Sequence, residues 1–349
     1  MRRILAGVAA MAGAALLVAG CSSGSSSPGG SSADGTSSAA AAAPVTVRLG
    51  YLANITHAPA LIAVKNGYFT SALGSAGTVK TSVFTSGTQE TTAILSGQLD
   101  AAYVGPNPAI NAWQKSGGTA IKIVSGVATG GASIVVKSGI SSATQLKGQS
   151  LATPSLGNTQ DVALRYWLKQ NGLTTSATGG GDVSIKPTST NSNAVLEFES
   201  GQIAGASEPA PYDIEMVKDG GKVLLSEPGV TTVLMVTQSF LSAHPAIVAD
   251  LLKANLEAIN YIKSDPSGAE AAANAELAAY TGKALKSSLV SASFKEITFT
   301  PDPDAASLTT DAQNAVSLGL LKPVNLSGIY DLGPLNTLLT AADQPTVSG

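Results

Sequence analysis

Short apolar segments alternate with segments of helical pattern along the chain after residue 44. Residues 45–51 alternate β-branched and polar side chains, as strands do, and residues 58–66 after the next turn have helix character. The cycle repeats, with strands expected at 79–84 and 101–104 and helices expected at 88–95 and 109–115. Because strands that alternate with helices of about ten residues form right-handed βαβ units, the pattern predicts a largely parallel sheet covered by helices.

A second series of the same kind follows the first. Strand character at 121–127 and 133–136 leads away from the first series, and the second begins near residue 145. Its expected elements are helices at 160–170 and 194–199 and strands at 183–186 and 203–207, after which 223–225 and 231–237 lead back toward the first series. The exit and return of the chain predict two α/β lobes. The first is expected to comprise 45–134 and 238–340, and the second 135–237, with a tail at 341–349.

The C-terminal third of the chain has a mainly helical pattern. Apolar residues recur at helical spacing through 245–263, and Pro245 suits a first helical turn. Asp265-Pro266 is typical of the start of the next helix, and Gly282 is typical of its end. We therefore expect helices to complete the first lobe.

The N-terminal segment indicates export. Arg2 and Arg3 precede an apolar run at 4–17 that is shorter than the roughly 20 residues needed to span a bilayer, as in a signal peptide. The run closes at Leu17-Val-Ala-Gly-Cys21, which resembles a bacterial lipobox, and Cys21 is the only cysteine. We expect a signal peptide at 1–20, a lipidated Cys21, a flexible Ser/Gly/Ala-rich tether at 21–44, and an extracytoplasmic protein anchored to the cell membrane.

Charge and chemistry exclude several classes of function. Without Arg2 and Arg3, 18 basic residues remain of the 20 and face 23 acidic ones, a net charge of −5, which argues against nucleic acid as a partner. Two histidines and one lipidated cysteine cannot build a zinc site of the usual kind, and no clustered Asp-x-Asp loop for calcium appears. P-loop, Gly-x-Gly-x-x-Gly and His-Glu-x-x-His patterns are also absent from the sequence. We expect no cofactor and no enzymatic activity.

Four expected strand-to-helix junctions carry residues that start helices, at 56–59, 86–89, 105–108 and 157–161. Residues 86–89 have the Ser-x-x-Gln spacing of a capping box, and Asn107 and Asn158 are expected N-caps. In open parallel sheets, ligands bind at this edge, where helix N-termini offer free N–H groups and partial positive charge. Any one junction could simply start a helix, but the four together favour a site for a small oxyanion. For His57 the residues leave a structural role and a pocket role equally open.

Several segments resemble those of the aliphatic-sulfonate, taurine and nitrate-binding proteins of ABC importers. The resemblance spans about 45–339, and its motifs lie at 49–60, 65–69, 97–109 and 151–161. It implies the type II periplasmic-binding-protein fold, with two α/β lobes joined by two crossing strands. It also implies that residues 206–211 are the family's acidic-Pro loop, although Tyr212 stands where a tryptophan is often found. The ligand-binding residues that it implies are Asn54, Thr56, His57, Gly87, Thr88, Asn107, Asn158, Thr159, Gln160 and Glu208.

The resemblance predicts a solute-binding protein, expected to be a monomer, that captures an aliphatic sulfonate and delivers it to an ABC permease. A receptor for taurine, nitrate or a phosphonate of the same family stays open as an alternative. A protein that binds a pyrimidine precursor of thiamine, or a related enzyme, is a further alternative. An enzyme of that kind fits poorly, because its active site would need a cysteine or histidine side chain and the only thiol is the expected lipid anchor.

Overall fold

The computed structural model describes residues 43–188 and 190–349. The expected signal peptide, Cys21 and all but the last two residues of the expected tether lie outside the described residues. Within the described part of the chain, no helix has the length and apolar character needed to cross a bilayer.

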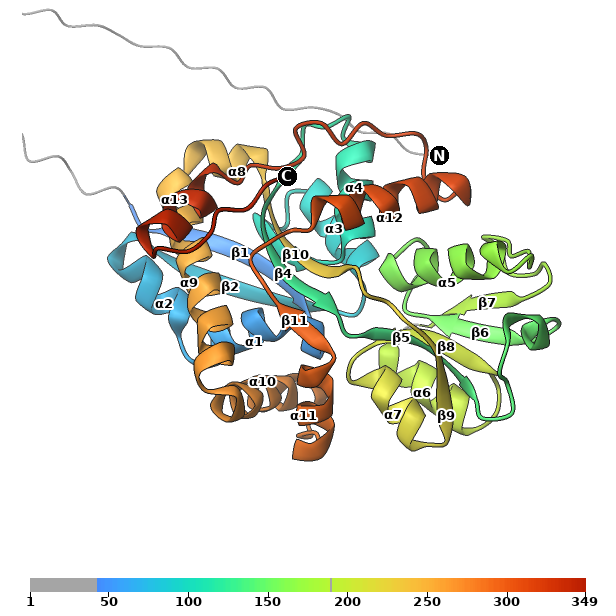
Figure 1. Cartoon of the computed structure of the whole chain (residues 1–349). Coiled ribbons are helices and arrows are strands. Elements are labelled where there is room, and N and C mark those ends of the chain that lie inside the picture. Colours follow the sequence, from blue (N-terminus) through green and yellow to red (C-terminus); the bar gives the residue numbers. More distant parts are fainter. Residues whose placement is uncertain (1–42, 189) are drawn as a thin grey trace, which may run out of the picture. The chain divides into compact units, whose positions relative to one another are not determined.

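The first lobe is built on a six-stranded sheet of described residues with the order β11-β4-β10-β3-β1-β2 (Figure 1). Strand β1 pairs in parallel with β2 and β3, whereas β10 runs antiparallel to β3 and β4. Its strands are β1 (Val45–Leu52), β2 (Gly77–Phe84), β3 (Ala101–Val104), β4 (Ile121–Gly130), β10 (Val230–Thr237) and β11 (Ile297–Phe299).

Both faces of this sheet are buried, as the near-continuous apolar runs of its strands require. Successive side chains of a strand point to opposite faces. In β3, Ala101 and Tyr103 therefore enter one apolar cluster, and Ala102 and Val104 enter another. One face is covered by α1 (Ala58–Lys65), α2 (Tyr68–Leu73), α9 (Pro245–Ser264) and α10 (Pro266–Thr281), and the other by α3 (Gly87–Leu95), α4 (Pro106–Lys115) and α12 (Ala305–Ser317).

The second lobe is built on a five-stranded sheet of described residues with the order β7-β6-β8-β5-β9. Strands β6, β7 and β8 are parallel, and β5 runs antiparallel to β8 and β9. Its elements are β5 (Ala132–Lys137), η3 (Ala143–Leu146), β6 (Ser150–Thr153), α5 (Thr159–Gln170), β7 (Ser184–Pro187), α6 (Asn191–Glu199), β8 (Gly205–Pro209), α7 (Tyr212–Lys218) and β9 (Gly221–Ser226).

The chain passes between the lobes at 131 and at 227–229, which corrects the expected boundaries. Strand β10 was expected in the second lobe, but its backbone pairs with β3 and β4 of the first sheet. Strand β5 already belongs to the second sheet from Ala132, which pairs with Pro209. An antiparallel strand that returns to the first sheet cannot be assigned from its own apolar pattern, because both sheets offer buried positions for it.

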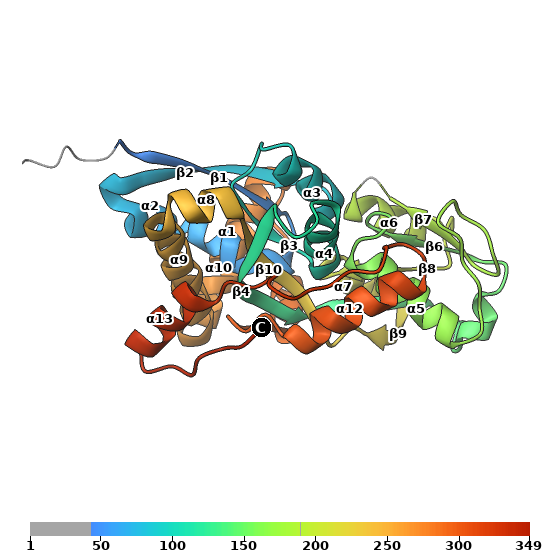
Figure 2. The ribbon, with the colours of Figure 1, turned by 90° about the horizontal axis from the view of Figure 1, so that it is seen from above.

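Helices complete the first lobe, as the sequence predicts. Asp265 caps α10 by accepting a hydrogen bond from the Gly268 N–H, and Gly282 ends it in the left-handed region. Helix α12 lies beside both α4 and α5, and so contacts both lobes (Figures 1 and 2). The remaining elements are η1 (Ile55–His57), η2 (Gly74–Ala76), α8 (Gln238–Ala243), α11 (Ser287–Lys295) and α13 (Gly333–Ala341).

Candidate functional site

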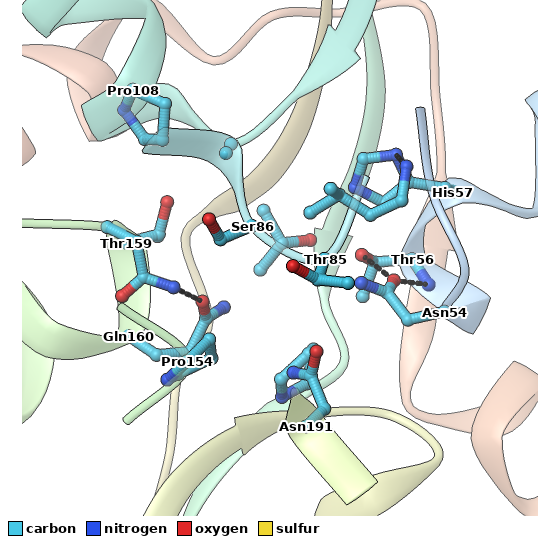
Figure 3. Close-up of a pocket in the computed structure, with 16 residues that line it drawn as sticks. Asn54, Thr56, His57, Thr85, Ser86, Pro108, Pro154, Thr159, Gln160 and Asn191 are labelled. Atoms are coloured by element: carbon cyan, nitrogen blue, oxygen red, sulfur yellow. Dashed lines mark hydrogen bonds between the residues drawn. The ribbon is translucent and has the colours of Figure 1, made fainter. Parts of the chain in front are cut away.

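A small cavity lies between the two lobes, at the carboxyl ends of the parallel strands (Figure 3). The space open to the centre of a water molecule is about 20 Å³, enough for one or two waters. The first lobe, including β10, contributes Leu52, Asn54, Thr56, His57, Thr85, Ser86, Gly87, Gly105, Pro108 and Thr231. The second lobe contributes Pro154, Asn158, Thr159, Gln160, Asn191 and Pro209.

Among the described residues, the N-termini of five helices border this cavity. The bordering residues are His57 before α1, Ser86 before α3, Gly105 before α4, Asn158 before α5 and Asn191 at the start of α6. The first N–H groups of a helix have no partner within the helix, and the helix dipole adds partial positive charge at the same end. The cavity therefore has an electropositive polar wall without any basic side chain among its described lining residues.

The start of α3 differs from the capping box expected at 86–89. Ser86 is the N-cap residue, but its side chain makes no capping hydrogen bond. The residue is buried, and its hydroxyl has no hydrogen-bond partner among the described residues that the structure records. Ser86 borders the cavity, so its hydroxyl remains available there. The adjoining Gly87 also lines the cavity, where an added Cβ would come 2.6 Å from Pro108.

The start of α4 corrects the expected role of Asn107. Gly105, not Asn107, is the N-cap residue, and Pro106 takes the first helical position. Asn107 is not among the residues that line the cavity, and its Nδ2 donates to the Asp311 carbonyl oxygen of α12 at 3.2 Å. Either proline of Gly-Pro-Asn-Pro can occupy the first helical position. The sequence alone therefore does not determine which residue is the N-cap, and the prediction of Asn107 was wrong.

His57 lines the cavity and has a defined tautomer. Its Nδ1 accepts a hydrogen bond from the Leu52 N–H at 3.3 Å, so in the neutral ring Nε2 carries the proton. Burial lowers the pKa of His57 to about 3. The ring is therefore a neutral donor at physiological pH, and the pocket role left open by the sequence is compatible with its position.

Asn54 and Thr56 form one unit next to His57 (Figure 3). The Asn54 Oδ1 accepts from the Thr56 N–H at 3.0 Å and from the Thr56 hydroxyl at 2.7 Å. Both residues are buried and line the cavity. Because its oxygen is used in this way, Asn54 has its Nδ2 left as a donor.

The second lobe contributes the start of α5. Asn158 caps the helix through a 2.9 Å bond from the Asp161 N–H to Oδ1, as expected. Its Nδ2 donates to Gln160 Oε1 at 3.1 Å, which leaves the Gln160 amide nitrogen as a donor. The Thr159 Oγ1 is buried without a hydrogen-bond partner among the described residues. All three residues line the cavity, as expected from the resemblance.

Thr88 and Glu208 were expected in the pocket, but neither is among its lining residues. The Thr88 hydroxyl pairs with the Ser155 hydroxyl of the other lobe at 3.0 Å. Glu208 is fully buried behind Asn191, whose Nδ2 donates to Glu208 Oε2 at 2.7 Å. Burial raises the pKa of Glu208 well above its usual range, despite the opposing hydrogen bond from Asn191. Glu208 therefore holds Asn191 in place instead of facing the cavity.

The lobes contact each other around the cavity. The Ile55 N–H donates to the Ala210 carbonyl oxygen at 2.9 Å, and the Tyr212 hydroxyl donates to the Ala53 carbonyl oxygen at 3.3 Å. Tyr212 thus connects the lobes, and it occupies the position where a tryptophan is often found in the proteins that the sequence resembles.

Several lining residues were not predicted from the sequence. They are Leu52, Thr85, Ser86, Gly105, Pro108, Pro154, Asn191, Pro209 and Thr231. Ser86, Gly105 and Pro108 lie within the junctions 86–89 and 105–108 that the sequence did single out, so taking every residue of those junctions as a candidate would have included them. Asn191 begins a helix expected only from residue 194, and Thr231 lies on a returning strand, so neither carried a local signal.

Two kinds of comparison place this architecture among known proteins. The chain matches solved structures at 15–20% identity, which is enough to show the fold. The alkanesulfonate-binding protein SsuA from Xanthomonas axonopodis pv. citri, bound to MOPS, has a TM-score of 0.70 at 18% identity, over 84% of this chain and 100% of that chain. The periplasmic nitrate-binding protein NrtA from Synechocystis PCC 6803 has a TM-score of 0.67 at 16% identity, over 86% and 90%.

A third solved structure is the putative sulfonate ABC transporter, periplasmic sulfonate-binding protein SsuA from Methylobacillus flagellatus KT. Its TM-score is 0.62 at 16% identity, over 88% of this chain and 99% of that chain. The two-lobed periplasmic-binding-protein fold expected from the resemblance is therefore confirmed. No curated protein matches the sequence. The model of the NMT1-like family matches residues 40–279, more than half of the chain, and the protein therefore belongs to the NMT1-like family.

Proposed function

We propose that this protein is an extracytoplasmic solute-binding protein that captures a small organic oxyanion, in the first place an aliphatic sulfonate, and delivers it to an ABC permease. The observation that carries the proposal is the convergence of five helix N-termini on one cavity with no basic side chain among its described lining residues. Partial charges and neutral N–H and O–H donors suit the spread charge of an oxyanion.

The available energies are sufficient for such binding. One helix end contributes about 0.3–1 kcal/mol toward a neighbouring charge, so five ends contribute roughly 2–5 kcal/mol. Each hydrogen bond to a charged group adds about 1.5–3 kcal/mol. A micromolar dissociation constant corresponds to about 8 kcal/mol, so three or four bonds from His57, Ser86, Thr159 or Gln160 would reach it.

Binding without catalysis is the simpler use of this cavity. His57 is the only titratable side chain among the described lining residues, and burial lowers its pKa to about 3. A general base works best with a pKa near the working pH, so His57 is poorly suited to that task. The described residues also hold no group of three or more His, Cys, Asp or Glu side chains able to bind a metal ion.

Delivery would depend on the two lobes. A ligand held by N-termini of both lobes favours the conformation in which they meet, through its higher affinity for that conformation. The similarity to sulfonate- and nitrate-binding proteins supports a partnership with a permease. Lipidation of Cys21 would keep the protein, expected to be a monomer, at the membrane.

The proposal is tested by calorimetry with ethanesulfonate, butanesulfonate, nitrate, sulfate and methylphosphonate. We expect the sulfonates to bind most tightly, and Asn158→Asp to weaken them at least tenfold. Aspartate is an equally good N-cap, so α5 should stay intact while the new charge repels the ligand. Asn325→Asp is the matched control, because Asn325 is exposed, lies outside the cavity and uses its Oδ1 only as an acceptor from Ser327 N–H. Absence of binding for all five anions would refute the proposed function.

A further inference from the structure

A second, larger cavity borders the first one on the side where the chain returns between the lobes. The space in it that is open to the centre of a water molecule is about 430 Å³; it is lined by α5, by residues 225–231 and by α12, and it is partly open to solvent. Thr159 and Thr231 line both cavities. Helix α12 lies beside α5 in both views of the chain (Figures 1 and 2), and each of these two helices forms one wall of the cavity.

The charged side chains of this second cavity are all acidic. Glu227, Asp304 and Asp311 line it, and no basic residue does among the described lining residues. Asp304 is engaged as the N-cap of α12, and Glu227 Oε1 accepts from the Ser207 hydroxyl at 2.6 Å. The Asp311 carboxylate has no hydrogen-bond partner among the described residues. Burial, followed by repulsion from Glu227 and Asp304, raises the pKa of Asp311 well above its usual range.

Part of the wall of this cavity on α5 is aromatic. Tyr166 and Trp167 of α5 line the same cavity, with Ala163 and Pro228. The faces of aromatic rings attract cations, and a buried carboxylate needs a cation to offset its desolvation. Acidic and aromatic groups together therefore favour an organic ammonium group over a neutral alkyl chain.

The boundary between the two cavities is itself polar. The Thr159 Oγ1 is buried and has no hydrogen-bond partner among the described residues. It lies where a ligand that enters both cavities would pass. The first cavity holds only one or two waters, so a sulfonate head could fit there after small movements but a bulky tail could not.

Taking the oxyanion site of the proposed function as given, we propose that the second cavity is a tail subsite for a bulky organic ammonium group. The natural ligand is then a zwitterion, with its sulfonate at the five helix N-termini and its ammonium between Asp311, Glu227 and the aromatic wall of α5. This subsite, not the head site, selects among sulfonates.

A pair of ligands of equal shape tests the subsite in the unmodified protein. 3-(Trimethylammonio)propane-1-sulfonate and 4,4-dimethylpentane-1-sulfonate differ in having N⁺ or carbon at the branch point. We expect calorimetry at pH 7.5 to give at least tenfold tighter binding for the ammonium compound. We also expect binding of the ammonium compound to release protons, because the cation favours ionised carboxylates. Titrations in two buffers of different ionisation enthalpy measure that release.

Two variants locate the effect. Asp311→Asn should reduce the tenfold preference to threefold or less, and adding Glu227→Gln should abolish it, while affinity for the carbon analogue changes less than threefold. Glu257→Gln, at an exposed position of α9, is the control and should keep the preference. Equal affinities for the two compounds in the unmodified protein would overturn the subsite while leaving the oxyanion site standing. If neither of these bulky sulfonates bound but ethanesulfonate did, the subsite would be overturned and the oxyanion site would stand, whereas the proposed function itself fails only if none of the five small anions binds.

Discussion

Glu227 lies where the chain returns between the lobes, and its burial makes stability depend on pH. The residue is 8% exposed, and burial raises its pKa from 4.5 to about 7, partly opposed by the hydrogen bond from Ser207. The folded protein therefore holds this proton more tightly than the unfolded chain. The stabilisation is complete below about pH 4.5 and is lost as the pH rises through 7. A shift of about 2.5 pH units corresponds to about 3 kcal/mol.

Glu227→Gln removes this titration and keeps the shape of the side chain. The amide oxygen can still accept from the Ser207 hydroxyl, so near pH 4 the variant should match the unmodified protein within about 1 kcal/mol. At pH 8 the variant should be more stable by about 3 kcal/mol. Urea unfolding followed by circular dichroism at both pH values measures the difference, with Glu257→Gln as the exposed control. An equal effect at pH 4 and pH 8 would contradict the reasoning.

Three further predictions concern other parts of the molecule. A Cβ added at Gly105 would come 2.5 Å from Thr159 Oγ1 of the other lobe, so Gly105→Ala should weaken ethanesulfonate binding at least tenfold in calorimetry. In a protein that already carries Thr159→Ala, the same substitution should weaken binding less than threefold. Burial lowers the pKa of His57 to about 3, so its neutral form contributes stability that is lost as the pH falls below 6.5. The unmodified protein should therefore lose about 2 kcal/mol more than His57→Asn between pH 6.5 and 4.5 in urea unfolding. Cys21→Ala should move the protein from the membrane fraction to the soluble fraction on cell fractionation, and unchanged membrane association would show another anchor.

The sequence predicted the two α/β series well because their signals are local. A continuous apolar run marked β3 at its observed bounds. Asn158, Asp265 and Gly282 marked helix ends through side-chain and backbone chemistry that acts within one turn. Asn54, Thr56 and His57, which the resemblance implied as ligand-binding residues, line the same cavity as Asn158, Thr159 and Gln160.

The errors concern interactions between distant segments. Asn107 bonds to α12 some 200 residues later, and Glu208 lies behind Asn191, which starts a helix of its own. Strand β10 belongs to the first sheet through pairing with β3 and β4. Local patterns carry no information on such partners. The larger acidic cavity was missed for the same reason, since Glu227 and Asp311 meet only when α12 packs beside α5.

An oxyanion site surrounded by buried acids raises an electrostatic question. Glu208 lies directly behind Asn191, and Glu227 lines the neighbouring cavity, so full ionisation of both would repel an anion. Burial raises the pKa of each carboxyl, that of Glu208 well above its usual range and that of Glu227 to about 7. A simple anion therefore meets less opposing charge than full ionisation would give, because Glu208 can keep its proton and Glu227 is only partly ionised near pH 7. A zwitterion instead ionises the acids next to its ammonium and pairs with them. The same residues can thus allow a sulfonate head to bind nearby and can stabilise a cationic tail. A residue with a fixed charge of either sign could not do both.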